Sequence, residues 1–456
     1  MTLSRRDFVR LTAGTGALAA LGQFGRTAAI AAPTGTYRAM VGIFLFGGND
    51  GWNMVIPTDA RHSTYLASRG SVAIPRASLT PLTNSAYALH PAMAALRPVW
   101  DEGSLGLVLN AGTLFAPLTK ATYQSRTDLR PANLMSHADE QDHWQGLRAR
   151  ETSRDGFLGR IADKMPASAL PPVMSLAGST VGVLGRQTTP LILPTGGGLP
   201  VRSGYTAGSN AKNSAITALG SSADGSTMLD GVAQTLTRNF DQAITANTIL
   251  VGTAPTDSFF VNPTTGAALT SDLAKQLMVV ARMIAARGTL GHARQNFLVS
   301  QGGYDTHSGQ VQTGNTAAGT HAGLLGDLAM AMAGFHKAMG SLGLANNVTS
   351  FTMSDFGRTY LGNGQAGTDH AWGSNHLVMG GDVAPGAVLG TYPDPVLGGA
   401  DDITKEGRFV PGVAQEEYLG AIARWHGVAD ADMPYVFPNW STWSTAGRGP
   451  LALFRG

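Results

Sequence analysis

The sequence contains no cysteine among its 456 residues. Disulfide bonds are therefore excluded, together with thiolate nucleophiles and thiolate metal ligands. Charged residues are also scarce, at 14%, and the 32 basic and 30 acidic residues form no long run of one sign. A protein that binds nucleic acid through its phosphates carries a basic patch or stripe, so this composition argues against that class. Any metal in this protein must be held by oxygen and imidazole ligands.

Long apolar runs are missing beyond the first thirty or so residues, so we expect no stable membrane span in the mature chain. The N-terminal segment has paired arginines, Arg5 and Arg6, then an apolar stretch and small residues at positions 29 and 31. This pattern predicts a twin-arginine signal peptide over residues 1–31, cleaved after Ala31. The alternative is a buried amphipathic helix. A signal peptide implies a periplasmic or secreted protein whose early partner is the twin-arginine translocation machinery.

Short apolar runs alternate with segments of helical spacing along the rest of the chain. The apolar runs, which predict buried strands, cover residues 39–46, 105–109, 172–176, 297–300, 348–353 and 377–379. The helical patterns cover residues 226–246, 271–287, 317–342 and 415–426. This alternation predicts an α/β fold with a doubly wound, mostly parallel sheet and helices on both faces. We expect residues 32–456 to form one domain, with a Gly/Ser-rich segment at about 191–226 that is a surface insertion or cap, and either a functional lid or simply a mobile loop.

Acidic and histidine residues follow several of the predicted strands. The carboxyl ends of parallel strands share one edge of a sheet, where open α/β sheets bind ligands. Carboxylate with imidazole is a ligand mixture that suits divalent metals such as zinc or manganese, and magnesium or calcium would use the carboxylates. We therefore predict a site for one or two divalent ions built from Asp50, Asp305, His307, Asp355, His370 and His376.

Three of these assignments have alternatives in ordinary structural chemistry. Asp50 lies in a Gly-Asn-Asp-Gly turn, where an aspartate often serves the turn alone. Arg358 either holds an anionic ester or pairs with the carboxylates beside it. Ser136 either caps the helix that follows it or acts as a nucleophile activated by nearby cations. The spacing G-x-G-x-x-G at 362–367 lacks the flanking strand and helix of a dinucleotide site, so no nucleotide cofactor is expected.

Four ordered motifs carry a resemblance to a known family. They are the strand ending in residues 44–51, then residues 303–308, 354–359 and 367–370, all behind the twin-arginine leader. With these motifs the chain resembles the bacterial family called domain of unknown function 1501. That family is similar to the alkaline phosphatase and sulfatase superfamily, which implies a doubly wound sheet with two divalent metals at its carboxyl edge.

The resemblance also implies roles for individual residues. Asp50 resembles the first-strand aspartate of one metal, Asp305 with His307 resembles the aspartate and histidine of the other, and Asp355 resembles the later aspartate. Ser136 would stand near the nucleophile, and His370 or His376 would be the final histidine. Two departures weaken the likeness: Phe356 stands where the superfamily has a histidine, and the spacing between Asp305 and His307 is short.

Two functions remain open from the sequence. The first is an exported metal-dependent hydrolase of phosphate or sulfate esters, with Ser136 and Arg358 as catalytic residues and an anionic small-molecule or polymer ester as substrate. The second is an inactive exported binding or scaffold protein that keeps the fold, which Phe356 favours.

Overall fold

The computed structural model describes residues 36–166, 168, 170–199, 218 and 227–455. The expected signal peptide at 1–31 lies outside these residues. So does most of the expected insertion at 191–226, because residues 200–217 and 219–226 are not described. In the part of the chain that is described, no helix has the length and apolar character needed to cross a membrane.

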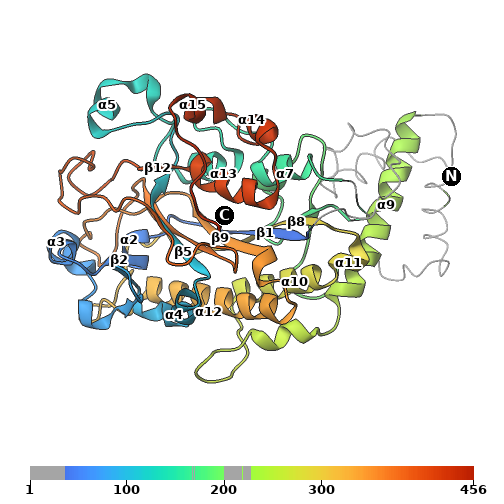
Figure 1. The fold of residues 1–456 in the computed structure, drawn as a ribbon, viewed down its shortest axis with the longest axis horizontal. Coiled ribbons are helices and arrows are strands. Elements are labelled where there is room, and N and C mark those ends of the chain that lie inside the picture. The colour runs from blue at the N-terminus through green and yellow to red at the C-terminus, as the bar shows by residue number, and fades with distance from the viewer. Residues whose placement is uncertain (1–35, 167, 169, 200–217, 219–226, 456) are drawn as a thin grey trace, which may run out of the picture.

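The central element is a nine-stranded sheet with the order β11-β5-β10-β9-β1-β8-β6-β7, in which β12 also pairs with β5 (Figure 1). Its strands are β1 (Arg38–Leu45), β5 (Leu105–Gly112), β6 (Val173–Ser175), β7 (Leu191–Ile192), β8 (Arg294–Gln301), β9 (Val348–Ser354), β10 (Ser374–Met379), β11 (Val388–Gly390) and β12 (Val413–Ala414). All pairings are parallel except those of β10, which runs antiparallel to both β5 and β9. A smaller sheet has the order β2-β4-β3, with β2 at Val55–Pro57, β3 at Thr80–Pro81 and β4 at Tyr87–Leu89.

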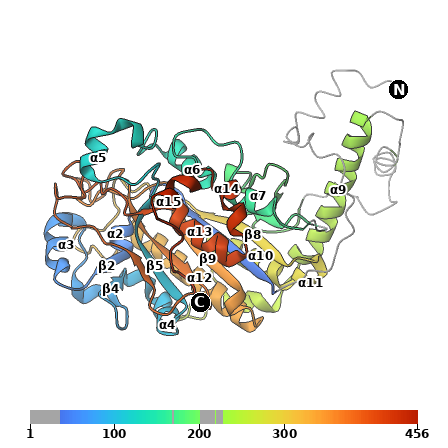
Figure 2. The same cartoon turned by 45° about the horizontal axis from the view of Figure 1, so that its top comes forward.

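The helices cover both faces of the large sheet (Figure 2). Their bounds are α2 (Gly51–Met54), α3 (Arg61–Arg69), α4 (Arg97–Asp101), α5 (Lys120–Ser125), α6 (His137–Gly146), α7 (Phe157–Ala162), α9 (Thr227–Leu250), α10 (Asp272–Ala285), α11 (Arg287–Leu290), α12 (Thr320–Ser341), α13 (Gln415–His426), α14 (Met433–Val436) and α15 (Trp440–Thr445). Strand β1 shows why two layers form. Its alternate side chains point to opposite faces, so Val41 and Ile43 join the core under α10 and α12, whereas Met40 and Phe44 join the core under α7 and α13.

The predicted elements agree closely with this architecture. The mixed α/β class and the large, mostly parallel sheet are confirmed, and Ser271 caps α10 by accepting a hydrogen bond from the Ala274 backbone N–H, as its sequence position predicts. The run at 377–379 does form a strand, but β10 is antiparallel. An apolar run buried on both faces carries no signal for strand direction, so the sequence could not distinguish the two cases.

Candidate metal centre

The candidate site lies where three adjacent strands end. Strands β9, β1 and β8 are neighbours in the sheet and all run in the same direction. The segments that follow them carry Asp355 after β9, Asp50 after β1, and Asp305 with His307 after β8. The sheet order therefore brings these segments together at one edge, as the clusters predicted.

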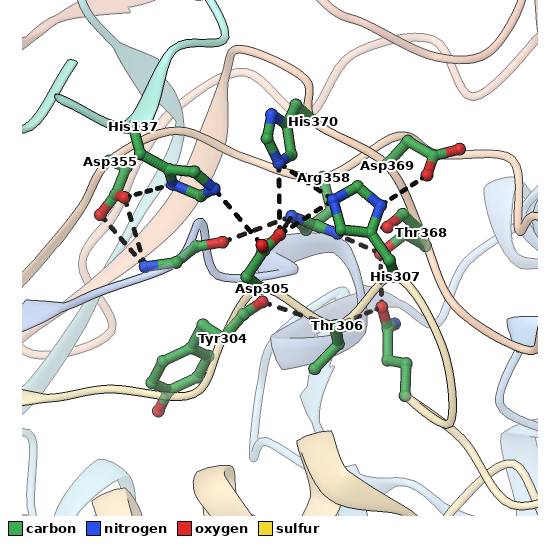
Figure 3. A network of polar contacts seen from close by, with 12 residues as sticks. His137, Tyr304, Asp305, Thr306, His307, Asp355, Arg358, Thr368, Asp369 and His370 are labelled. Atoms are coloured by element: carbon green, nitrogen blue, oxygen red, sulfur yellow. Dashed lines mark hydrogen bonds and ion pairs between the residues drawn. The ribbon is translucent and has the colours of Figure 1, made fainter. Parts of the chain in front are cut away.

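Three imidazole rings converge on the carboxylate of Asp305 (Figure 3). Nε2 of His307 lies 3.0 Å from Asp305 Oδ1, and Nε2 of His370 lies 3.2 Å from the same oxygen. Nε2 of His137 lies 3.5 Å from Asp305 Oδ2. Ligand atoms of His137, Asp305 and His370 all lie within 4.8 Å of one another, which is compact enough to surround one metal ion.

The opposite nitrogen of each ring faces an oxygen acceptor. Nδ1 of His137 lies 2.7 Å from Asp355 Oδ2, and Nδ1 of His307 lies 2.7 Å from Asp369 Oδ1. Nδ1 of His370 lies 2.9 Å from the backbone carbonyl oxygen of Met135. These acceptors favour a proton on Nδ1 of all three rings and leave each Nε2 lone pair directed at the common centre. This is the arrangement that orients histidine ligands in metal sites.

The close approach of two bare ring nitrogens tests whether a cation fits. Nε2 of His307 lies only 3.0 Å from Nε2 of His370, and both nitrogens face the carboxylate of Asp305. Burial lowers the pKa of His370, so this ring is neutral at neutral pH. With the ring protons on Nδ1, two lone pairs and a carboxylate oxygen would face one another, and a divalent ion among them would remove their repulsion. The residues present therefore fit a metal, and their imidazole content favours zinc or manganese over magnesium or calcium.

Arg358 supports the site from beneath. Its side chain is fully buried, and its Nη1 donates to Asp305 Oδ1 at 2.6 Å and to the Gly47 carbonyl oxygen at 3.3 Å. Its other guanidinium nitrogens bond to Thr368. Burial by itself raises the pKa of Asp305, but the hydrogen bond and charge of Arg358 outweigh it and hold that pKa below its usual value. Of the two roles that the sequence allowed for Arg358, the structure shows the pairing with a neighbouring carboxylate.

Phe356 lies against two of the candidate ligands. It is almost fully buried, and its ring centroid is 4.7 Å from those of both His137 and His370. Gly48, with φ of 80°, makes room for this ring, because a Cβ at that position would lie 2.5 Å from Phe356. The ring therefore closes one side of the site to water and fixes the two imidazoles. The imidazole of His137, at the start of α6, lies beside this ring.

Asp50 is held apart from the three rings. Its carboxylate forms a fully buried ion pair with Arg69 at the end of α3, and it accepts a hydrogen bond from Gln310 Nε2 at 2.6 Å. It also accepts from the backbone N–H groups of Trp52 and Asn53, at 3.2 and 3.3 Å, and so caps α2. Burial raises the pKa of Asp50, but the charge of Arg69 outweighs it and leaves the pKa below its usual value. Asp50 thus holds the turn and α2, and a guanidinium occupies the position beside it that a second metal would need.

His376 lies in the protein core on β10. It is almost fully buried, with its ring 5.0 Å from Trp144 and 5.6 Å from Tyr418, centroid to centroid. None of the contacts among His137, Asp305, His307 and His370 includes it. Of the two histidines that the sequence offered as the final ligand, the structure brings His370 to the site.

The burial of His376 predicts acid sensitivity. Burial lowers its pKa from 6.5 to about 3. Between these values the unfolded chain binds one more proton than the folded chain, so stability falls as the pH drops below 6.5 by about 1.4 kcal/mol per pH unit for this group. His376→Leu should reduce the slope of unfolding free energy against pH by that amount in urea titrations of the metal-free protein from pH 6.5 to 4.5. Leu377→Ala, the control, should lower stability without changing the slope, and an unchanged slope in His376→Leu would contradict the prediction.

Ser136 stands directly before His137 at the start of α6. Its Oγ donates to Asp139 Oδ2 at 2.5 Å, and this hydrogen bond holds the pKa of Asp139 below its usual value. The serine is therefore at the helix N-terminus, as predicted, but its hydroxyl contacts a side chain of the first turn and no backbone N–H. A carboxylate with a lowered pKa is a weak base for removing the hydroxyl proton.

Two functional residues were missed as site members. His137 lies within the densest titratable stretch of the sequence, but the spacing of that stretch predicts a helix and does not indicate which histidine turns inward. Asp369 precedes His370 directly, and its role appears only in the hydrogen bond to His307. The only signal in the sequence for including Asp369 in the site was its position next to His370, a predicted ligand.

Comparison with family models places most of the chain in a known family. Residues 37–404 match the model of a family described as "Protein of unknown function (DUF1501)". No curated protein matches the chain.

Proposed function

Because the chain belongs to the DUF1501 family of unknown function, whose model covers residues 37–404, we propose its function from the site itself: an exported metal-dependent hydrolase of phosphate or sulfate esters. The observation that carries this proposal is the convergence of three Nε2 atoms on Asp305 while every Nδ1 faces an oxygen acceptor. Exposure supports a catalytic over a structural metal. The four side chains are between 27% and 45% exposed, so a substrate can reach them.

The ester class follows from the resemblance of the motif order to the alkaline phosphatase and sulfatase superfamily. The confirmed sheet, with its candidate site at the carboxyl ends of β9, β1 and β8, is consistent with that resemblance. In this proposal the twin-arginine leader delivers the folded protein to the periplasm or the medium. The protein can therefore bind its metal before export.

Held by His137, Asp305, His307 and His370, a divalent ion would supply Lewis acidity for the hydrolysis of an ester. The protein's own contribution is orientation. Asp355, Asp369 and the Met135 carbonyl fix the three rings, and Arg358 fixes Asp305. Phe356 excludes water from one side of the rings.

Water is the favoured nucleophile over Ser136. The serine hydroxyl donates to Asp139, a weak base, and no hydrogen bond joins it to the candidate ligands. Arg358 is buried with its guanidinium bonded to protein groups, so its role in this proposal is to hold Asp305.

The deciding experiment is a metal count on the purified mature protein, combined with turnover of 4-nitrophenyl phosphate and 4-nitrophenyl sulfate. We expect one zinc or manganese ion per chain, turnover of one of the esters, loss of turnover after chelation and its return when the metal is restored. Absence of stoichiometric metal, or full activity in Asp305→Asn, would refute the proposal. Tight metal binding without turnover of any ester in a wider panel would favour the binding-protein alternative.

The Ser136→Ala variant separates the two nucleophiles in the same assay. We expect it to keep its metal and most of its turnover. A loss on the order of 10⁶-fold with unchanged metal content is the size of effect seen when a serine nucleophile is removed, and it would assign that role to Ser136.

A further inference from the structure

A fully buried acid, Glu140, lies one helical turn after His137 in α6. Its Oε1 accepts a hydrogen bond from the backbone N–H of Met135 at 2.6 Å. It contacts none of the candidate metal ligands directly in the hydrogen bonds of the described residues. Burying a carboxyl group costs free energy, so its position beside the site calls for a structural explanation.

The backbone of Met135 supplies that reason. Its φ is 68°, in the left-handed region that favours glycine, although it carries a long side chain. The N–H on one side of this residue is held by Glu140, and the carbonyl oxygen on the other side accepts from His370 Nδ1 at 2.9 Å. The two hydrogen bonds hold the unfavourable backbone conformation from both ends.

We propose that Glu140 is a positioning residue for the metal centre: by holding the Met135 backbone it aims the Met135 carbonyl at His370 and fixes Nε2 of that ring toward Asp305. The inference rests on the proposed function, because it treats His370 as a ligand. Glu140 does not contact His370 directly. It acts through Met135, whose carbonyl oxygen accepts from His370 in the segment before β10.

Glutamine is a close substitute for this acid. Burial raises the pKa of Glu140 well above its usual value, which favours the neutral acid, and glutamine has nearly the shape of that form. Glu140→Gln keeps an oxygen that can accept from Met135. Glu140→Met keeps the length and removes the acceptor, and Glu140→Asp keeps the acceptor but withdraws it by one methylene group.

The test is the affinity of the full mature protein for Zn²⁺, measured by competition with a chromophoric chelator, together with the visible absorption of the Co²⁺ form. We expect Glu140→Gln to match the wild type. We expect Glu140→Met and Glu140→Asp to bind Zn²⁺ on the order of 10- to 100-fold more weakly, the range found when outer partners of metal ligands are lost, with altered Co²⁺ absorption. The control is Leu277→Ala in the core of α10, which should lower stability but leave affinity and absorption unchanged.

Each outcome decides the matter. Wild-type affinity in both Glu140→Met and Glu140→Asp, or equal weakening in Glu140→Gln, would overturn the positioning role. If Glu140→Met does not fold, the comparison of Glu140→Asp with Glu140→Gln still decides. A wild-type protein that binds no metal would refute the proposed function, whereas a metal-binding wild type with unaffected variants would refute only this inference.

Discussion

Asp305→Ala should bind Zn²⁺ at least about 100-fold more weakly than the wild type, a loss of about 2.7 kcal/mol. Asp305 is the single carboxylate that all three ring nitrogens face, at 3.0, 3.2 and 3.5 Å. Its loss removes the negative charge that balances the ion. In the wild type the buried guanidinium of Arg358 lies 2.6 Å from the Asp305 carboxylate. The substitution leaves this cation without its partner and close to the metal position. Both effects act in the same direction, so this substitution should have the largest effect on affinity. Chelator competition at constant pH measures it.

Asp369→Asn is the matched control for this substitution. Asp369 Oδ1 accepts from His307 Nδ1 at 2.7 Å and lies outside the ring of donor atoms. Asparagine offers an oxygen at the same place, so we expect a loss near the lower end of the roughly 10- to 100-fold range for outer partners. Equal affinities in Asp305→Ala and wild type would place the metal elsewhere, and a larger loss in Asp369→Asn would make Asp369 the ligand.

The fold was largely predictable because its strands are buried on both faces. Such strands appear as unbroken apolar runs, and β1, β8 and β9 were found in this way. Polar residues directly after them, Asp305 and His307 among them, were therefore placed at the correct edge. Placing these residues at the edge of the sheet requires only the position where each strand ends and the parallel arrangement of the strands, and both can be inferred from local sequence.

The remainder of the site depends on contacts between distant segments. The partner of Asp50 is Arg69, which lies 19 residues away at the end of a helix, and nothing near Asp50 in the sequence indicates that a cation will neutralise it. His370 and His376 lie before and within a strand whose direction the sequence did not reveal, so their order along the chain could not show which ring enters the site. Phe356 was interpreted as a missing ligand from the resemblance alone, and its contacts with two histidines of other segments could not be predicted.

Strain at Met135 was also outside the reach of sequence. Its φ of 68° costs on the order of 1–3 kcal/mol for a residue with a side chain, and the contacts with Glu140 and His370 hold it together with the turn hydrogen bond from the Ser136 N–H to the Asn133 carbonyl oxygen. A pattern method based on propensity predicts the conformation that a segment prefers by itself. Functional segments that are held against that preference are the places where such a prediction fails.

Arg69→Met should lower the free energy of unfolding by about 3–5 kcal/mol, the cost of removing one partner of a buried ion pair. Arg69 and Asp50 are both fully shielded from solvent, and the guanidinium also donates to the Thr359 carbonyl oxygen at 3.3 Å and lies over the ring of Tyr360. Methionine fills much of the space but leaves the carboxylate of Asp50 charged in the interior. Urea unfolding of the metal-free protein at neutral pH measures the loss.

The double variant Asp50→Asn/Arg69→Met identifies the cause of this loss. Asparagine keeps an oxygen for the α2 backbone N–H groups and has no charge, so the double variant should be more stable than Arg69→Met alone. Arg126→Met, which breaks an exposed pair with Asp128, should leave stability unchanged. If Arg69→Met is as stable as Arg126→Met, the charge of Asp50 is not balanced by Arg69.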